Sequence, residues 1–343
     1  AIDTLSHHVG QKATVFKKFD LCYAGNVMKW IQAANSLRLR LAIRIAKVDP
    51  EKAKAEAEKA VGQTYGLITA NTDNLMIALN NYPHPLWTFS NGWDECRMCA
   101  TIGSVLGGYN DPRLSVYFSP ATDPAVSGKY IGIRQGIDIS SKSTYVNFSP
   151  IGAMYETAKS VQIITASEVA FLLAEGALRG WNMGGDAAVF YNRGIALSLS
   201  QYGLSNDYET YRNDQTSTFM DYSDPKNTAN NFSKSSNITI KWDENASKEE
   251  KLERIITQKW IALFPDGQEA WSEFRLTGYP KLLPVVVNYS GGTISTSGFV
   301  RRVPYPDDEY LTNPDGIAGA LGLLGGSDTG GTRLWWDTGG TNF

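Results

Sequence analysis

Apolar residues recur at intervals of three and four in the stretch 252–283, and this spacing predicts an amphipathic helix. Ser247 precedes the apolar positions as a helix cap, and the turn that follows it is acidic. The turn sequence Pro-Asp-Gly at 265–267 then ends the helix, and a second short helix is expected at 268–276. Two helices joined by a tight turn predict an αα-hairpin near residues 247–278.

The segment near residues 26–62 predicts another helix pair. Its first half fits a helical stripe, although the Leu and Ile positions between 37 and 45 also alternate as they would in a strand. The length, the absence of helix breakers and the many strong helix formers favour the helix. Asp49 and Pro50 then supply a cap and a first helical position, and an alanine-rich helix continues to Gly62.

Helical spacing returns near residues 165–203, where small and apolar residues are placed roughly as in tetratricopeptide helix pairs. The remaining segments are rich in Gly, Pro, Asn and Ser and predict loop-rich regions at 63–150, 204–246 and 284–343. Within the first of these, only 114–118 and 130–134 predict short strands. We therefore expect a mostly α fold of helix hairpins with a large loop-rich, short-strand insertion. Such insertions often carry function.

The chain has 343 residues, of which 42% are hydrophobic and 20% charged, a balance typical of globular proteins. The formal net charge of −3 provides no basic surface, so no nucleic-acid partner is expected. No apolar run approaches eighteen residues, and therefore no membrane-spanning helix is predicted. Three Cys residues are too few for a disulfide scaffold, and their odd number leaves at least one thiol unpaired within the chain.

Aromatic and polar side chains gather in one loop of the insertion and have the chemistry of a sugar-binding site. The loop contains Tyr82, Trp87, Phe89, Asn91, Trp93, Asp94 and Arg97. Flat rings stack on sugar C–H surfaces, while amide and guanidinium groups bond pairs of hydroxyls. The alternative is that these rings fill a core beneath the helices.

Tyr109 lies further along the insertion and, with Arg113, could line the same face as the aromatic loop. The sequence Asp111-Pro112-Arg113 favours a structural turn with an ion pair. The candidate ligand-binding residues are Tyr82, Trp87, Asn91, Trp93, Arg97 and Tyr109.

Other tryptophans divide by their surroundings. Trp260 and Trp271 lie on periodic helical faces, and Trp181 follows a helix-ending glycine, so all three are expected in the core. Polar or Gly-rich sequence surrounds Trp242, Trp335 and Trp336, which are reserve candidates for an exposed platform.

Carboxylates are plentiful, and a glycosidase needs two of them about 5–10 Å apart in a cleft. Two pairs share a helix face: Glu168 with Glu175, and Glu269 with Glu273. Helical Glu at such spacing usually caps a helix or pairs with an Arg, here Arg254 or Arg275. We therefore predict no catalytic residue and no enzymatic activity.

Cys96 and Cys99 have the spacing of half a zinc site or of a redox pair. No second Cys pair exists in the sequence, and His84 is the only nearby His. No Walker loop, dinucleotide-binding glycine pattern or HExxH motif occurs. We expect two buried thiols, no metal and no cofactor.

Six short motifs occur in a fixed order along the chain. They are Trp30 with 34–40 (ANSLRLR), 111–113 (DPR), 132–136 (GIRQG), Glu168 with 174–175 and 180–181, the hairpin motif spread over 258–280, and 301–306 (RRVPYP). In this order they resemble the SusD/RagB family, the surface glycan-binding lipoproteins of the Bacteroidetes. The resemblance extends from about residue 20 to about residue 315.

This sequence departs from the family pattern in two ways. Family members have an N-terminal lipoprotein signal and a first helical repeat before the segment 34–40, whereas this sequence begins at Ala1 without either. We interpret the chain as N-terminally truncated, so part of the ligand platform is expected to be missing.

The resemblance implies a single SusD-like domain over 1–343, with a tetratricopeptide-like α-solenoid and a loop-rich face. It implies a non-catalytic protein that holds glycan or oligosaccharide at the outer-membrane surface and delivers it to a SusC-like TonB-dependent transporter. Attachment to the membrane would be through a lipid anchor absent from this chain. Two alternatives remain, a helical-repeat scaffold that binds only protein and a polysaccharide-active enzyme. The sequence does not distinguish one glycan from another, or a glycan from a peptide.

Overall fold

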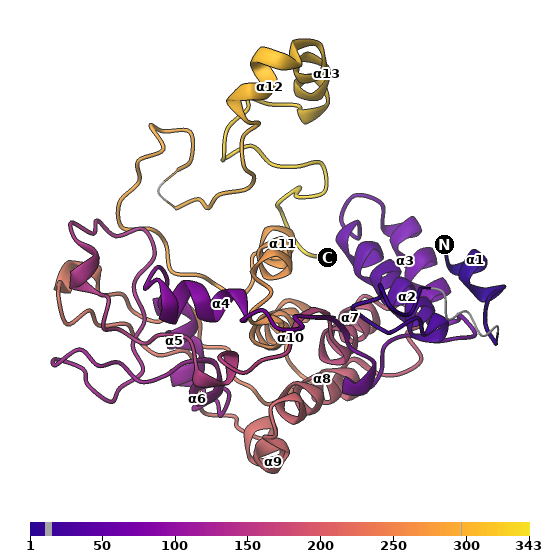
Figure 1. Cartoon of the computed structure of the whole chain (residues 1–343), viewed down its shortest axis with the longest axis horizontal. Helices are drawn as coiled ribbons and strands as arrows, with labels where there is room; N and C mark the ends of the chain where they lie inside the picture. The colour runs from indigo at the N-terminus through magenta and orange to yellow at the C-terminus, as the bar shows by residue number, and fades with distance from the viewer. Residues whose placement is uncertain (11–15, 296) are drawn as a thin grey trace.

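The computed structural model describes residues 1–10, 16–295 and 297–343. Helices dominate it, and three helix pairs lie together across its middle and one side (Figure 1). The loop-rich insertion lies on the other side of these pairs, and α12 (Asp307–Thr312) and α13 (Pro314–Leu324) project away from them. The mostly α fold predicted from the sequence is confirmed.

The first pair consists of α2 (Val27–Arg44) and α3 (Pro50–Val61). The side chain of Asn26 caps α2, and that of Asp49 caps α3 by accepting the N–H of Lys52. Alanines at 53, 57 and 60 are fully buried, and their small size lets α3 pack closely on α2. The helix favoured over the strand in this segment is therefore present.

The second pair consists of α7 (Ala166–Leu178) and α8 (Ala187–Gln201), and it is the centre of the fold. Every residue of α7 from Ala166 to Gly176 is buried, because α7 packs against α8, α10 and α2. Close approach of α7 and α8 requires glycine at 194, where an added Cβ would lie 2.6 Å from the ring of Phe171.

The third pair consists of α10 (Lys248–Leu263) and α11 (Gly267–Thr277). Ser247 and Glu250 form a capping box at the start of α10. Gly278 ends α11 with a φ of 79°, a left-handed conformation that glycine adopts without strain. Contacts of α10 with α7, α8 and α11 join the third pair to the other two in a tetratricopeptide-like succession.

The sheet consists of two short antiparallel strands, β1 (Leu75–Ala78) and β2 (Ser160–Ile164). Neither strand was predicted, and the two predicted strands are wrong. Residues 114–117 form the helical turn α6 (Leu114–Tyr117), and in 130–134 only an isolated bridge between Ile133 and Cys99 is found.

Shorter helical segments complete the described chain. They are α1 (Ile2–Ser6), η1 (Asn71–Asp73), α5 (Ala100–Gly108), η3 (Lys142–Thr144), η4 (Ala153–Tyr155), η5 (Ser205–Asp207), α9 (Tyr208–Arg212) and η6 (Thr228–Asn230). In the segment 284–343, of which residue 296 lies outside the described residues, α12 and α13 replace part of the predicted loop. Among the described helices, none combines the length and apolar character needed to cross a membrane.

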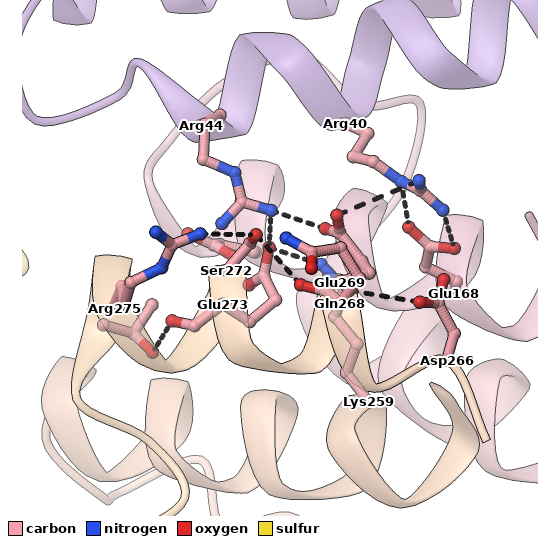
Figure 2. Close-up of polar contacts among 12 residues, drawn as sticks. Arg40, Arg44, Glu168, Lys259, Asp266, Gln268, Glu269, Ser272, Glu273 and Arg275 are labelled. Atoms are coloured by element: carbon pink, nitrogen blue, oxygen red, sulfur yellow. Dashed lines mark hydrogen bonds and ion pairs between the residues drawn. The ribbon is translucent and has the colours of Figure 1, made fainter. Parts of the chain in front are cut away.

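Charged side chains of alternating sign cross the interface between α2 and the helices α7, α10 and α11 (Figure 2). The contacts, with N–O distances, are Arg40–Glu168 (2.6 Å), Arg44–Glu269 (2.5 Å), Arg44–Glu273 (3.0 Å) and Lys259–Glu273 (3.0 Å). Lys259 is fully buried. Burying charges is tolerated only when each has a partner, so this row fixes how the first pair sits on the third.

Candidate ligand-binding site

The predicted aromatic loop forms a short helical segment. The helix α4 (Pro85–Trp87) leads directly into one wider π-helical turn, η2 (Thr88–Gly92). His84 precedes α4, and its Nδ1 accepts the N–H of Leu86 at 3.2 Å. Asp94 follows with a φ of 57°, in the left-handed region, and turns the chain. Isolated π-helical turns occur frequently at functional sites.

Three aromatic rings of this loop face solvent. Tyr82 is 78% exposed, Trp93 57% and Phe89 48%. The rings of Phe89 and Trp93 meet edge to face, with centroids 4.9 Å apart and an interplanar angle of 65°. This contact holds both rings in place while leaving ring surface open, which suits stacking on a sugar.

Trp87 and Asn91 are half-buried members of the same segment. Trp87 packs against the main hydrophobic core, so it anchors the loop on the helices. The Asn91 Nδ2 donates to the carbonyl of Ile151 at 3.5 Å, whereas its Oδ1 is buried without a hydrogen-bond partner in the described chain. Both residues lie next to the exposed rings, and their contact with a ligand stays a prediction.

Tyr109 is not a surface residue, and its predicted ligand contact is wrong. Its side chain is 2% exposed, its hydroxyl donates to the Ile238 carbonyl at 3.1 Å, and its ring packs on Phe219. The predicted turn beside it is confirmed, because Arg113 and Asp111 form a fully buried ion pair at 2.6 Å. A buried tyrosine that bonds backbone has no sequence signature that separates it from an exposed one.

Arg97 is engaged by the protein itself. Its side chain is 7% exposed, and its guanidinium donates to the carbonyls of Val146 (2.6 Å) and Ser90 (2.8 Å) and to the Asp94 carboxylate (2.6 Å). This side chain therefore shapes the loop that presents the rings, and its bond to a sugar hydroxyl pair stays a prediction.

A small pocket of about 140 Å³ opens beside Trp93, and it adds residues that sequence reasoning missed. Lys142 lines it and donates to the backbone carbonyl of Trp93 at 2.8 Å and to the exposed carboxylate of Glu95 at 2.7 Å. Charged groups of this kind form strong hydrogen bonds with hydroxyl groups. Lys142 is distant from Trp93 in sequence and belongs to a segment without periodicity, so no pattern connects the two.

The other tryptophans are mostly occupied by contacts within the chain. Trp242 packs on Tyr191. The half-buried Trp336 packs on the main core and, with the 70% exposed Trp335, lines a pocket of about 740 Å³, so these two keep the possibility of a platform. Trp271 is half-buried rather than in the core, and its indole N–H donates to the Val300 carbonyl at 3.0 Å.

The four helical glutamates considered for catalysis are buried structural partners. Glu175 pairs with Arg179, and Glu168, Glu269 and Glu273 belong to the row of alternating charges described above. The basic partners of these glutamates are therefore not the expected Arg254 and Arg275. Burial raises the pKa of Glu269 to about 7 against the attraction of Arg44. Burial also opposes ionisation of Glu273, but Lys259 and Arg44 hold its pKa below the usual range. None of the four lines the pockets beside the aromatic loop.

The three cysteines are free thiols, and Cys96 and Cys99 are half-buried. Within the part of the chain that the structure describes, no three His, Cys, Asp or Glu side chains are grouped so that they could hold a metal ion.

Comparison with known proteins places this geometry in a family. Residues 1–337 match the family described as SusD-like, the Susd and RagB outer membrane lipoproteins. No curated protein matches the chain. Proteins of the SusD-like family are non-catalytic binding lipoproteins of the outer membrane.

Solved structures of SusD homologues superpose on nearly the whole chain. A chitin-binding homologue from Flavobacterium johnsoniae is 46% identical with a TM-score of 0.96, and the match covers 100% of this chain and 70% of that one. A homologue from Bacteroides vulgatus is 40% identical with a TM-score of 0.94 over the same shares. A third, from Bacteroides uniformis, is 41% identical with a TM-score of 0.90, covering 98% of this chain and 70% of that one. The chain therefore belongs to the SusD/RagB family of outer membrane lipoproteins.

Proposed function

We propose that the protein binds oligosaccharides of N-acetylated amino sugars, the class to which chitin belongs, on the face formed by residues 82–97. The observation that carries the proposal is the exposed, mutually braced pair Phe89 and Trp93, with Tyr82 nearby in the chain. Glycan binding is the activity of the SusD-like family, and a homologue 46% identical to this chain is chitin-binding.

The chemistry of the face supports a sugar ligand over an apolar one. Lys142, which donates to the backbone carbonyl of Trp93, and its partner Glu95 are exposed charged side chains that keep hydrogen-bonding capacity at the surface of this segment. Rings bind the C–H faces of a sugar, and the charged groups bind its hydroxyls. Rings that are exposed rather than enclosed in a pocket also suit a chain of sugars.

The test is a titration of the protein with chitin hexasaccharide, followed by isothermal calorimetry, beside a panel of other oligosaccharides. We expect Trp93→Ala to weaken binding roughly thirtyfold, because loss of an aromatic anchor costs about 2 kcal/mol. Tyr289→Ala is the matched control, since it removes another exposed aromatic ring outside the loop. Equal affinity of wild type and Trp93→Ala for every bound glycan would refute the assignment of the face.

We further propose that the bound glycan passes to a SusC-like TonB-dependent transporter, so that the protein is one half of an uptake system. Family membership supports this step. Purification of the protein from outer membranes in mild detergent should recover a TonB-dependent barrel with it. A pull-down that recovers the barrel while all glycans fail to bind would favour the protein-binding scaffold instead.

A further inference from the structure

A second pocket, of about 260 Å³, opens between the aromatic loop and the turn that joins α10 to α11. Leu86 and the residues 96–99 line it from the loop, Ile102 from α5, and Trp260 and Ala270 from the helix pair. In Figure 1, α4 and α5 lie beside the α10–α11 pair, as this shared lining requires.

Trp260 is the unusual residue of the pocket wall. Between Leu252 and Leu263 every residue of α10 is buried except Trp260, which is half-buried. The sequence predicts this ring in the core, and it does pack there on one side. Its remaining surface faces the open pocket, where a large apolar ring in contact with water favours an occupant.

The wall of the pocket is mainly apolar, with Met98, Ile102, Phe118 and Trp260 among its members. The charged side chains that line it are Arg97, which is engaged by the loop, and Asp266. Asp266 caps α11, where one carboxylate oxygen accepts the N–H of Glu269 at 3.1 Å. Its carboxylate lies in the charge row near Glu168 and Arg40 (Figure 2), so the open wall of the pocket is apolar and a matching group is apolar on most sides.

The size and position of the pocket limit what can enter it. Its volume is slightly below the roughly 300–1,000 Å³ of pockets that bury whole drug-sized ligands. It holds a substituent or a single ring, while a longer chain must lie outside. Cys96 lines the pocket and follows Trp93 by three residues, so their Cα atoms are at most about 11 Å apart. This separation is short enough for one oligosaccharide to contact both the loop and the pocket.

We propose that this pocket, here called the acetamido pocket, receives the N-acetyl group of an amino sugar whose chain lies on the exposed rings. The methyl group contacts the apolar wall formed by Met98, Ile102 and Trp260. The inference rests on the proposed function and adds the element that selects the sugar class. A hydroxyl in the same place has no methyl group to contact the apolar wall and gives up its bonds to water on entering, so it gains less from the pocket than the acetamido group does.

The test compares chitin hexasaccharide with cellulose hexasaccharide, which is also neutral and carries a hydroxyl where chitin carries the acetamido group. We expect wild type to bind the chitin chain at least tenfold more tightly in calorimetric titrations. Ala270→Leu fills the pocket from α11 with a good helix former. It should remove most of this preference by weakening chitin binding alone, whereas Ala55→Leu, on the exposed side of α3, should leave it unchanged.

A second measurement uses the wild-type protein and does not depend on how a variant folds. Cys96 lines the acetamido pocket, so an occupant should slow its alkylation by iodoacetamide, followed peptide by peptide with mass spectrometry. Burial raises the pKa of the Cys96 thiol, and the reaction is therefore run at mildly alkaline pH. We expect chitin hexasaccharide to protect Cys96 several-fold, and cellulose hexasaccharide at equal occupancy of the rings to protect it little.

The possible outcomes separate the two proposals. If Trp93→Ala weakens binding while Ala270→Leu leaves the chitin preference intact and Cys96 unprotected, the acetamido pocket is refuted and the glycan face stands. Equal wild-type affinity for the two hexasaccharides likewise refutes the pocket alone. If wild type binds neither hexasaccharide, the proposed function and the pocket fall together.

Discussion

The helix pairs and the aromatic loop keep their shapes by different means. In the pairs, backbone groups bond one another within helices, and side chains contribute packing and the buried charge row. In the loop, side chains bond the backbone directly: Arg97 donates to the Val146 carbonyl, and the Ser90 hydroxyl accepts the N–H of Ile151 at 3.0 Å. A helix pair therefore depends on a repeated pattern, whereas the loop depends on single polar residues.

The largest loss of stability is expected when a single polar residue of the insertion is replaced. Asp111→Ala leaves the fully buried guanidinium of Arg113 without the carboxylate that accepts from it at 2.6 Å and 2.9 Å. We expect a loss of about 3–5 kcal/mol in the free energy of unfolding, measured with urea. Lys54→Ala, which removes an exposed partner of Glu58, is the control and should change stability little. Similar free energies of unfolding for the two variants would contradict the view that the fold depends on Asp111.

A smaller loss of stability is expected at the contact between α7 and α8, where the fit of side chains alone determines how closely the helices approach. The methyl group added by Gly194→Ala would lie 2.6 Å from the ring of Phe171. Overpacking of this kind costs about 1–3 kcal/mol, observable as a lower thermal midpoint. Gly319→Ala in α13 meets no atom within 4 Å and is the matched control, expected to be neutral or slightly stabilising. Tolerance of both changes would mean that the helix pairs are more loosely packed than described.

The smallest effect concerns the charge row and depends on pH. Burial raises the pKa of Glu269 to about 7 from an ordinary value of 4.5, so the folded state binds a proton that the unfolded state has released between these values. Stability should therefore fall as the pH rises from about 5 to 7, by on the order of 1–2 kcal/mol. In Glu269→Gln this decline should disappear. Urea unfolding of both proteins at pH 5 and pH 7.5 measures it, and parallel pH dependence in the two would exclude Glu269 as its source.

Much of the helical frame could be predicted from the sequence, because spacing, caps and turn residues are local signals. The capping box at Ser247 and the cap at Asp49 are visible in the sequence itself. The strand β1 (Leu75–Ala78) was missed because its partner lies more than eighty residues away and its four residues show no alternation. Residues 114–118 alternate as a strand would, yet 114–117 fold as a helical turn after the buried Arg113, and only Phe118 forms an isolated bridge, to Ile151.

The candidate site was predictable in kind but not in detail. The cluster of aromatic residues identified the loop, and three of its rings are exposed. Exposure itself has no local signal, so Tyr109 was misplaced and the engagement of Arg97 by backbone carbonyls was not foreseen. The partner Lys142 and the pocket at Trp260 depend on tertiary contacts between distant segments, which periodicity cannot reveal.

The row of alternating charges joins residues that the ribosome makes far apart in time. Arg44 and Glu269 are separated by 225 residues. At about 5–20 residues per second, a ribosome needs roughly 11–45 s to add that length. Arg38 and Arg40 find Glu56 and Glu168 earlier, whereas Arg44 lacks the carboxylate of Glu269 throughout that interval. The end of α2 is therefore the part of the first helix pair that stays uncovered longest.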